Sequence, residues 1–204
     1  GAITAGVAGV RVFNSYPTLA LDTLSSTGIG DGKLMRFKIT AASAGPVGVS
    51  QMKFTLSTTT LNFTNIGLYA YTDSSYSTGI SGQGTSGQIG SNIAVGSTVS
   101  NVSTLTAAPT TNPVQIPAGS TIYFELRGTV AANATGASAV TTLSGDSAYI
   151  TTNDTYRGYF VATSSNVTAT SNFVWSGNAT STAATADVDW SNGYGLAGFP
   201  FSWE

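Results

Sequence analysis

The stretch Ser120–Val130 (STIYFELRGTV) decides the fold class, because apolar and polar side chains alternate along it. One face of the extended chain carries Ile122, Phe124 and Leu126, and the opposite face carries Tyr123, Glu125 and Arg127. A period of two residues is typical of a strand with one buried face and one solvated face. The stretch therefore predicts a strand of an antiparallel sheet, with Glu125 and Arg127 forming an ion pair on its outer surface.

Other segments of the chain repeat this alternation. The expected strands are Lys33–Thr40, Val47–Ser57 and Asn65–Thr72, with shorter ones at Ser147–Ile150, Arg157–Thr163 and Asn172–Trp175. Turn signals separate them, such as Asp31-Gly32, Ala44-Gly45-Pro46 and Pro117-Ala118-Gly119. Residues 73–111 are rich in Gly, Ser and Thr and are expected to form a long loop or irregular hairpins. The pattern predicts an all-β fold, an antiparallel β-sandwich of Greek-key or jelly-roll type, with one domain over residues 14–204.

The composition narrows the possible functions. Charged residues are 8% of the chain and the net charge is −2, too few cations for a nucleic-acid interface or a basic membrane-binding face. The absence of His and Cys excludes Ser-His-Asp and Cys-His catalysis, the usual zinc sites and disulfides. No apolar run reaches the roughly 20 residues that a membrane-spanning helix needs, so we expect no membrane insertion. A chain that begins with Gly1 and depends on Ser, Thr and Asn for solubility is expected to be a secreted protein whose signal peptide has been removed.

Motifs for catalysis or cofactor binding are weak. Gly82, Gly84 and Gly87 match G-x-G-x-x-G, but no helix is expected after them to receive a phosphate. Asp187 and Asp189 share a face if extended, and are the candidate ligands for Ca²⁺, which prefers about six oxygens. We therefore expect no enzymatic activity and no bound cofactor.

The chain carries six Asn-x-Ser/Thr sequons, at Asn62, Asn101, Asn133, Asn153, Asn166 and Asn178. A coat of covalent glycans would solvate a surface that has few charges. The sequons are therefore candidate glycosylation sites.

The C-terminal third carries a further pattern of spaced aromatic residues. It comprises Phe173, Trp175 and Ser176, a Ser/Thr-rich spacer, then Asp189, Trp190, Asn192, Gly193, Tyr194 and Pro200. From about Leu34 to Pro200 the chain resembles a family of secreted β-rich surface proteins of uncultivated, small-genome bacteria. The resemblance implies an extracellular role associated with the cell wall or an appendage, and no particular activity.

The N-terminal residues 1–13 are expected to form a strand segment ahead of the domain. Ile3, Ala5 and Val7 alternate on one face, and after a phase shift at Ala8-Gly9 the apolar face continues with Val10 and Val12. This segment is either the first strand of its own sheet or a donor strand that completes the sandwich of an identical subunit. Head-to-tail exchange of this kind builds filaments.

These observations predict a structural subunit of a pilus-like homopolymer. A surface-layer protein and a viral or tail-fibre jelly roll are alternatives. Another is a monomeric carbohydrate-binding or adhesin module, in which Tyr and Trp would stack on sugar rings.

Overall fold

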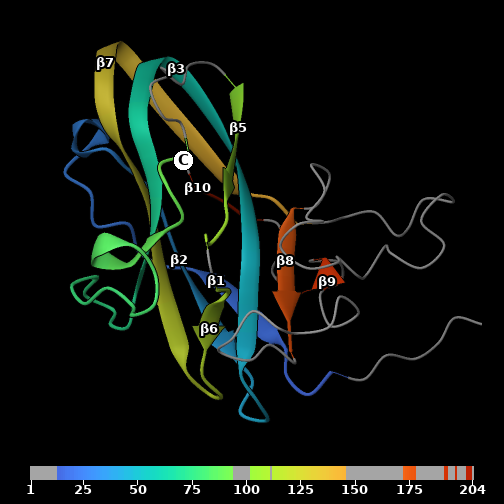
Figure 1. Ribbon diagram of the computed structural model, residues 1–204. Helices are drawn as coiled ribbons and strands as arrows, with labels where there is room; N and C mark the ends of the chain where they lie inside the picture. The colour runs from blue at the N-terminus through green and yellow to red at the C-terminus, as the bar shows by residue number, and fades with distance from the viewer. Residues whose placement is uncertain are drawn as a thin grey trace, which may run out of the picture.

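A computed structural model describes residues 13–93, 102–110, 112–145, 172–177, 191–192, 196 and 201–203. These residues form one antiparallel sheet of ten strands and two short 3₁₀ turns, which confirms the predicted all-β class (Figure 1). The strands are β1 (Pro17–Leu21), β2 (Lys33–Ala41), β3 (Val47–Tyr71), β4 (Gln88–Ile89), β5 (Val102–Ala107), β6 (Val114–Ile116), β7 (Thr121–Leu143), β8 (Phe173–Ser176), β9 (Ser191–Asn192) and β10 (Phe201–Trp203). The turns are η1 (Ile29–Asp31) and η2 (Thr85–Gly87).

The two longest strands, β3 and β7, form the centre of the fold. They pair with each other from Phe54↔Leu143 to Tyr71↔Tyr123 and bend together at the top of Figure 1. At the bend the register shifts between Thr59 and Leu61, and Thr60 has a φ of 49°. Bulges of this kind let one strand pass from one layer of a sandwich to the other. Each long strand therefore contributes to both layers.

The remaining strands extend the two layers on either side of this pair. In one layer β1 pairs with β2, and β2 pairs with the first half of β7. In the other layer β5, β6 and β8 pair with the first half of β3, and β10 pairs with the end of β7. The consecutive strands β2 and β3 lie on opposite sides of β7, an order found in Greek-key and jelly-roll folds.

The hydrophobic core lies between the layers. Phe37 of β2 stacks on Phe124 of β7, its neighbour in the same layer, with ring centroids 5.0 Å apart. Phe37 also meets Phe54 of the opposite layer at 5.9 Å, and all three rings are fully buried. The inward residues expected from the alternation, including Met35, Met52 and Leu126, are buried too.

The structure differs from the sequence-based expectation in several elements, including β1 and β6, which were not expected, while the expected strands Ser147–Ile150 and Arg157–Thr163 lie outside the described residues. Val47–Ser57 and Asn65–Thr72 are parts of one strand, β3, because the residues between them also pair with β7. β7 continues to Leu143, well beyond the expected end at Val130. The segment 73–111, expected as loop or irregular hairpins, includes the regular strand β5, which pairs with Met52–Ser57. The G-x-G-x-x-G segment ends in the single turn η2 followed by β4, so it opens no α-helix.

Candidate functional site

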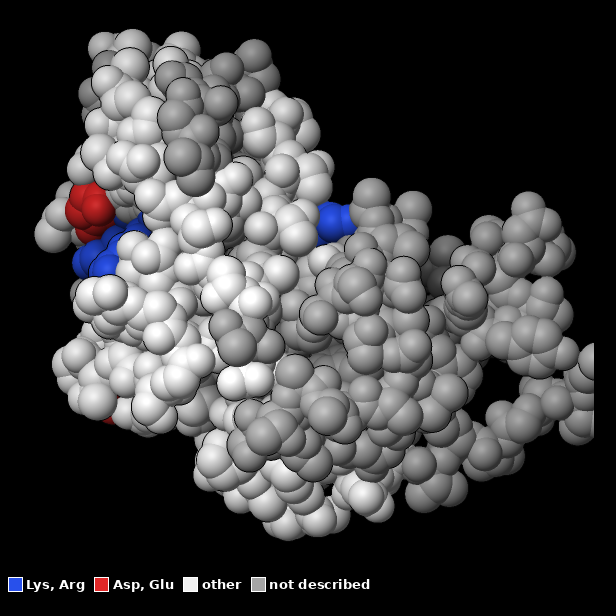
Figure 2. All heavy atoms as spheres, in the orientation of Figure 1, with Lys and Arg blue, Asp and Glu red and all other residues white. Residues whose placement is uncertain are grey.

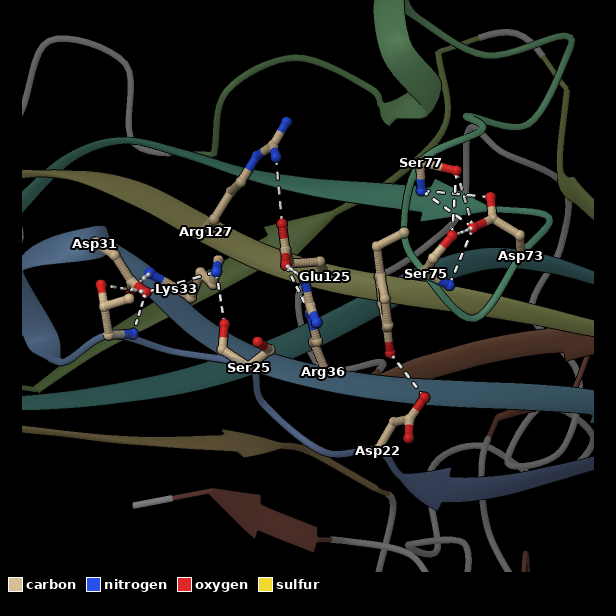
Figure 3. Close-up of polar contacts among 12 residues, drawn as sticks. Asp22, Ser25, Asp31, Lys33, Arg36, Asp73, Ser75, Ser77, Glu125 and Arg127 are labelled. Atoms are coloured by element: carbon tan, nitrogen blue, oxygen red, sulfur yellow. Dashed lines mark hydrogen bonds and ion pairs between the residues drawn. The ribbon is translucent and has the colours of Figure 1, made fainter.

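The outer face of β2, β7 and β3 carries a buried carboxylate held by two arginines (Figure 3). Glu125 of β7 is 2% exposed. Its Oε2 accepts a hydrogen bond from Nε of Arg36 at 2.7 Å and forms an ion pair with a terminal nitrogen of the same guanidinium, also at 2.7 Å, and its Oε1 accepts a hydrogen bond from Arg127 at 3.2 Å. The predicted ion pair of Glu125 with Arg127 is present, but its expected place on the exposed surface is wrong.

Tyrosine rings cover this ion pair and account for its burial. The guanidinium of Arg36 lies 3.8 Å from the centroid of the Tyr76 ring, and that of Arg127 lies 3.8 Å from the centroid of Tyr69. Such cation–π contacts shield the guanidinium faces from water. The edge-on neighbours of Tyr76 are Tyr71 and Tyr123, with centroids 5.6 and 5.9 Å away. The tyrosines predicted on outward strand faces therefore pack on one another and on arginine.

Tyr76 reaches this position from a loop, and two contacts hold it there. Its hydroxyl donates a hydrogen bond to Asp22 at 3.0 Å. Burial, with this hydrogen bond, raises the pKa of Tyr76 above its ordinary value of 10.0. Burial likewise raises the pKa of Tyr71. The phenol of Tyr76 is therefore a neutral donor at physiological pH.

Asp73 shapes the loop that carries Tyr76. Its carboxylate accepts hydrogen bonds from the hydroxyls and backbone N–H groups of Ser75 and Ser77 and from the N–H of Thr78. The Ser75 hydroxyl is the largest of the influences that lower the pKa of Asp73 below its ordinary value of 3.8. Local bonds of this kind stabilise a tight turn.

Both carboxylate oxygens of Glu125 accept a hydrogen bond from an arginine, so the carboxylate is held between Arg36 and Arg127. Within the described ranges, no group of three His, Cys, Asp or Glu side chains is placed to hold a metal ion. Figure 2 shows only small blue and red areas on this side of the molecule, and most of the described surface in that view is white.

A second feature is an edge of the sheet along β7. The N–H of Gly128 donates to the carbonyl of Gly32 at 2.9 Å, and Thr141 pairs with Trp203 of β10. Between these two points, no strand in the described part of the chain pairs with the β7 edge that faces away from β3. We call the residues Thr129–Val140 the open edge. They include no charged residue and no proline, the usual protection of an exposed edge.

The chain enters the domain beside β8. The ring of Phe13 packs on Trp175 with centroids 5.0 Å apart. A Cβ added at Gly177 would lie 2.2 Å from the carbonyl oxygen of Ser15, so the entering chain lies directly against β8. Phe173, Trp175 and Ser176, three residues of the C-terminal pattern, are all buried in β8. In this position they stabilise the core and the entry of the chain.

Most of the residues predicted to be functional lie outside the described residues. These are the donor-strand residues Ile3, Ala5, Val7, Val10 and Val12, the candidate calcium ligands Asp187 and Asp189, and the sequons at Asn101, Asn153, Asn166 and Asn178. Asn62 is half-buried on β3, and Asn133 lies opposite Leu61 on β7. The sequence interpretation missed the tyrosine cover over the ion pair, although the alternation placed Tyr123 on the same outer face as Glu125 and Arg127.

In the part of the chain that the structure describes, no helix is long and apolar enough to cross a membrane. No protein-family model matches the chain, and searches of the curated proteins and of the solved structures return no match.

Proposed function

We propose that this protein is the structural subunit of an extracellular pilus-like filament, assembled by exchange of the Gly1–Val12 segment between identical subunits. One observation carries the proposal. The described strands form one antiparallel sheet that includes an edge with no pairing strand in the described part of the chain, and such an edge can accept a strand from another chain. The apolar, alternating Gly1–Val12 segment is suited to supply that strand.

The energetics of such an exchange are favourable. Burial of Ile3, Val7 and Val10 contributes about 1.5–3 kcal/mol each, and each ladder hydrogen bond adds about 1 kcal/mol. The segment carries only one charge, at Arg11, so little desolvation of charged groups opposes its burial. The proposal includes secretion to the cell surface and glycans on the sequons. The glycans would supply the solubility that a filament subunit with few charges needs from another source.

The proposal is tested by deleting Gly1–Gly9 and following assembly by electron microscopy and sedimentation. We expect a folded monomer with the near-UV spectrum of the full chain and no filaments. A finer pair of variants separates the two faces of the segment. Ile3→Lys with Val7→Lys should abolish filaments, whereas Thr4→Lys, on the opposite face, should retain them. Filaments formed by the deleted chain would contradict the proposal, as would its failure to fold.

A carbohydrate-binding module is the second candidate, and it is supported by Tyr16. Tyr16 is 56% exposed and is available for stacking on a sugar. Retention of the Gly1–Gly9 deletion variant on an immobilised polysaccharide, lost in Tyr16→Ala, would favour this function. Tyr69 and Tyr76 support it less, because arginine covers a face of each ring.

A further inference from the structure

The open edge of β7 is flanked by strands at both of its ends. On the side of β7 that faces away from β3, β2 pairs with residues 121–127 and β10 pairs with residues 141–143. A strand added along Thr129–Val140 would therefore continue a row of the sheet that β2 and β10 begin. Beside this edge, Val130, Ala137 and Ala139 pack against the core but remain only partly buried. An added strand with apolar side chains would complete their burial.

From this arrangement we infer that the open edge accepts the Gly1–Val12 segment of a second copy of this chain. The inference rests on the proposed function and adds the site at which the donor strand binds. The open edge is interrupted by a bulge, because Ser138 pairs with Thr59 and Asn133 pairs with Leu61. The register shifts again within Thr129–Asn133, because Phe63 pairs with Val130 and Asn62 pairs with Ala132, and three further residues, Ser138–Val140, follow the larger bulge.

The donor segment is also interrupted once along its length. Its alternation covers five residues in Ile3–Val7, breaks at Ala8-Gly9 and resumes over three residues in Val10–Val12. A phase break in the donor can accommodate one of the register shifts of the acceptor edge, since an unbroken alternation would turn the apolar face of the donor outward beyond a bulge. Small residues in both partners, such as Ala5 and Ala132, allow close approach of the added strand.

The distance along the sheet favours a donor from another copy. Trp175, which anchors Phe13, pairs with Val49, and the nearest residue of the open edge, Val140, pairs with Ser57. These eight positions along β3 correspond to about 26 Å at 3.3 Å per residue. The segment Gly1–Val12 has twelve residues, and about eight of these residues would be needed to span this distance. The remaining four or so are too few to pair along the open edge of the same molecule. A second copy placed end to end has no such restriction.

Cysteine cross-linking tests the inference directly, because the chain has no native cysteine. Single-cysteine variants Val7→Cys and Ala132→Cys are mixed, and the assembled material is treated with a short bis-maleimide. We expect cross-linked dimers from this pair. The matched control replaces Ala132→Cys by Thr104→Cys, an exposed position on β5, and should give at most about a tenth of the dimer if the acceptor is β7.

Other results would contradict the β7 acceptor, the proposed function or both. Cross-linking to Thr104→Cys instead would overturn the β7 acceptor, and so would an intramolecular link in the double variant Val7→Cys/Ala132→Cys at high dilution. Absence of the Ala132→Cys link, with filaments still lost on deletion of Gly1–Gly9, would refute the acceptor edge alone. Absence of the link with filaments unaffected by the deletion would refute the proposed function as well. As an independent readout, Ala132→Lys should raise the critical concentration for assembly about tenfold or more, whereas Thr104→Lys should leave it unchanged.

Discussion

The buried ion pair on the outer face predicts an unequal response to removal of its two arginines. Arg36 donates a short hydrogen bond to Glu125 and forms a 2.7 Å ion pair with it, and its side chain is 13% exposed, whereas Arg127 donates one longer bond and is 42% exposed. Arg36→Ala removes the main partner of a buried carboxylate. In other proteins this kind of change lowers the free energy of unfolding by about 3–5 kcal/mol. Arg127→Ala removes a half-exposed partner and should cost about 0–1 kcal/mol.

Urea unfolding provides the assay. For an m-value of about 2–3 kcal/mol/M, the midpoint of Arg36→Ala should fall by about 1–2 M, and that of Arg127→Ala by less than about 0.5 M. The double variant Arg36→Leu/Glu125→Leu serves as the control, because replacing both charges by apolar side chains is often neutral. Equal losses for the two alanine variants, or a loss below about 1 kcal/mol for Arg36→Ala, would refute the view that the tyrosine cover keeps Glu125 dry.

Three further predictions concern the tyrosine cover, the core and the chain entry. Because folding raises the pKa of Tyr76, its contribution to stability is complete below pH 10.0 and declines above it, so Tyr76→Phe should flatten the alkaline fall in the free energy of unfolding measured by urea titration. Phe37→Ala should cost about 3–5 kcal/mol in the same assay, and a loss under about 1 kcal/mol would contradict the two-layer core. Gly177→Ala should cost about 1–3 kcal/mol because its Cβ meets the Ser15 carbonyl. The control Gly30→Ala, where nothing lies within 4 Å, should change the midpoint little, and equal effects of the two substitutions would argue against the close approach.

Local alternation was a reliable guide where one face of a strand is buried and the other is solvated. β2 and the first half of β7 follow this pattern, and the predicted inward residues, such as Phe124 and Leu126, are in the core. The second half of β7 gave no such signal, because Thr129–Val140 consists of small and polar residues that suit a loop as well as a strand. Its extended form comes from backbone pairing with β3, a partner more than sixty residues away in the chain.

The sequence by itself determined the all-β class, the inward and outward faces of the regular strands and the apolar character of the N-terminal segment, since these depend only on the order of side chains along an extended chain. Only the tertiary structure decided that β3 is a single strand passing through both layers, that Tyr76 packs on Arg36, the main partner of Glu125, and that the β7 edge is left open in the described chain. Each of these features depends on which distant segments meet. That choice is made by the packing of the whole core and by bulges such as the one at Thr60, which local periodicity does not encode.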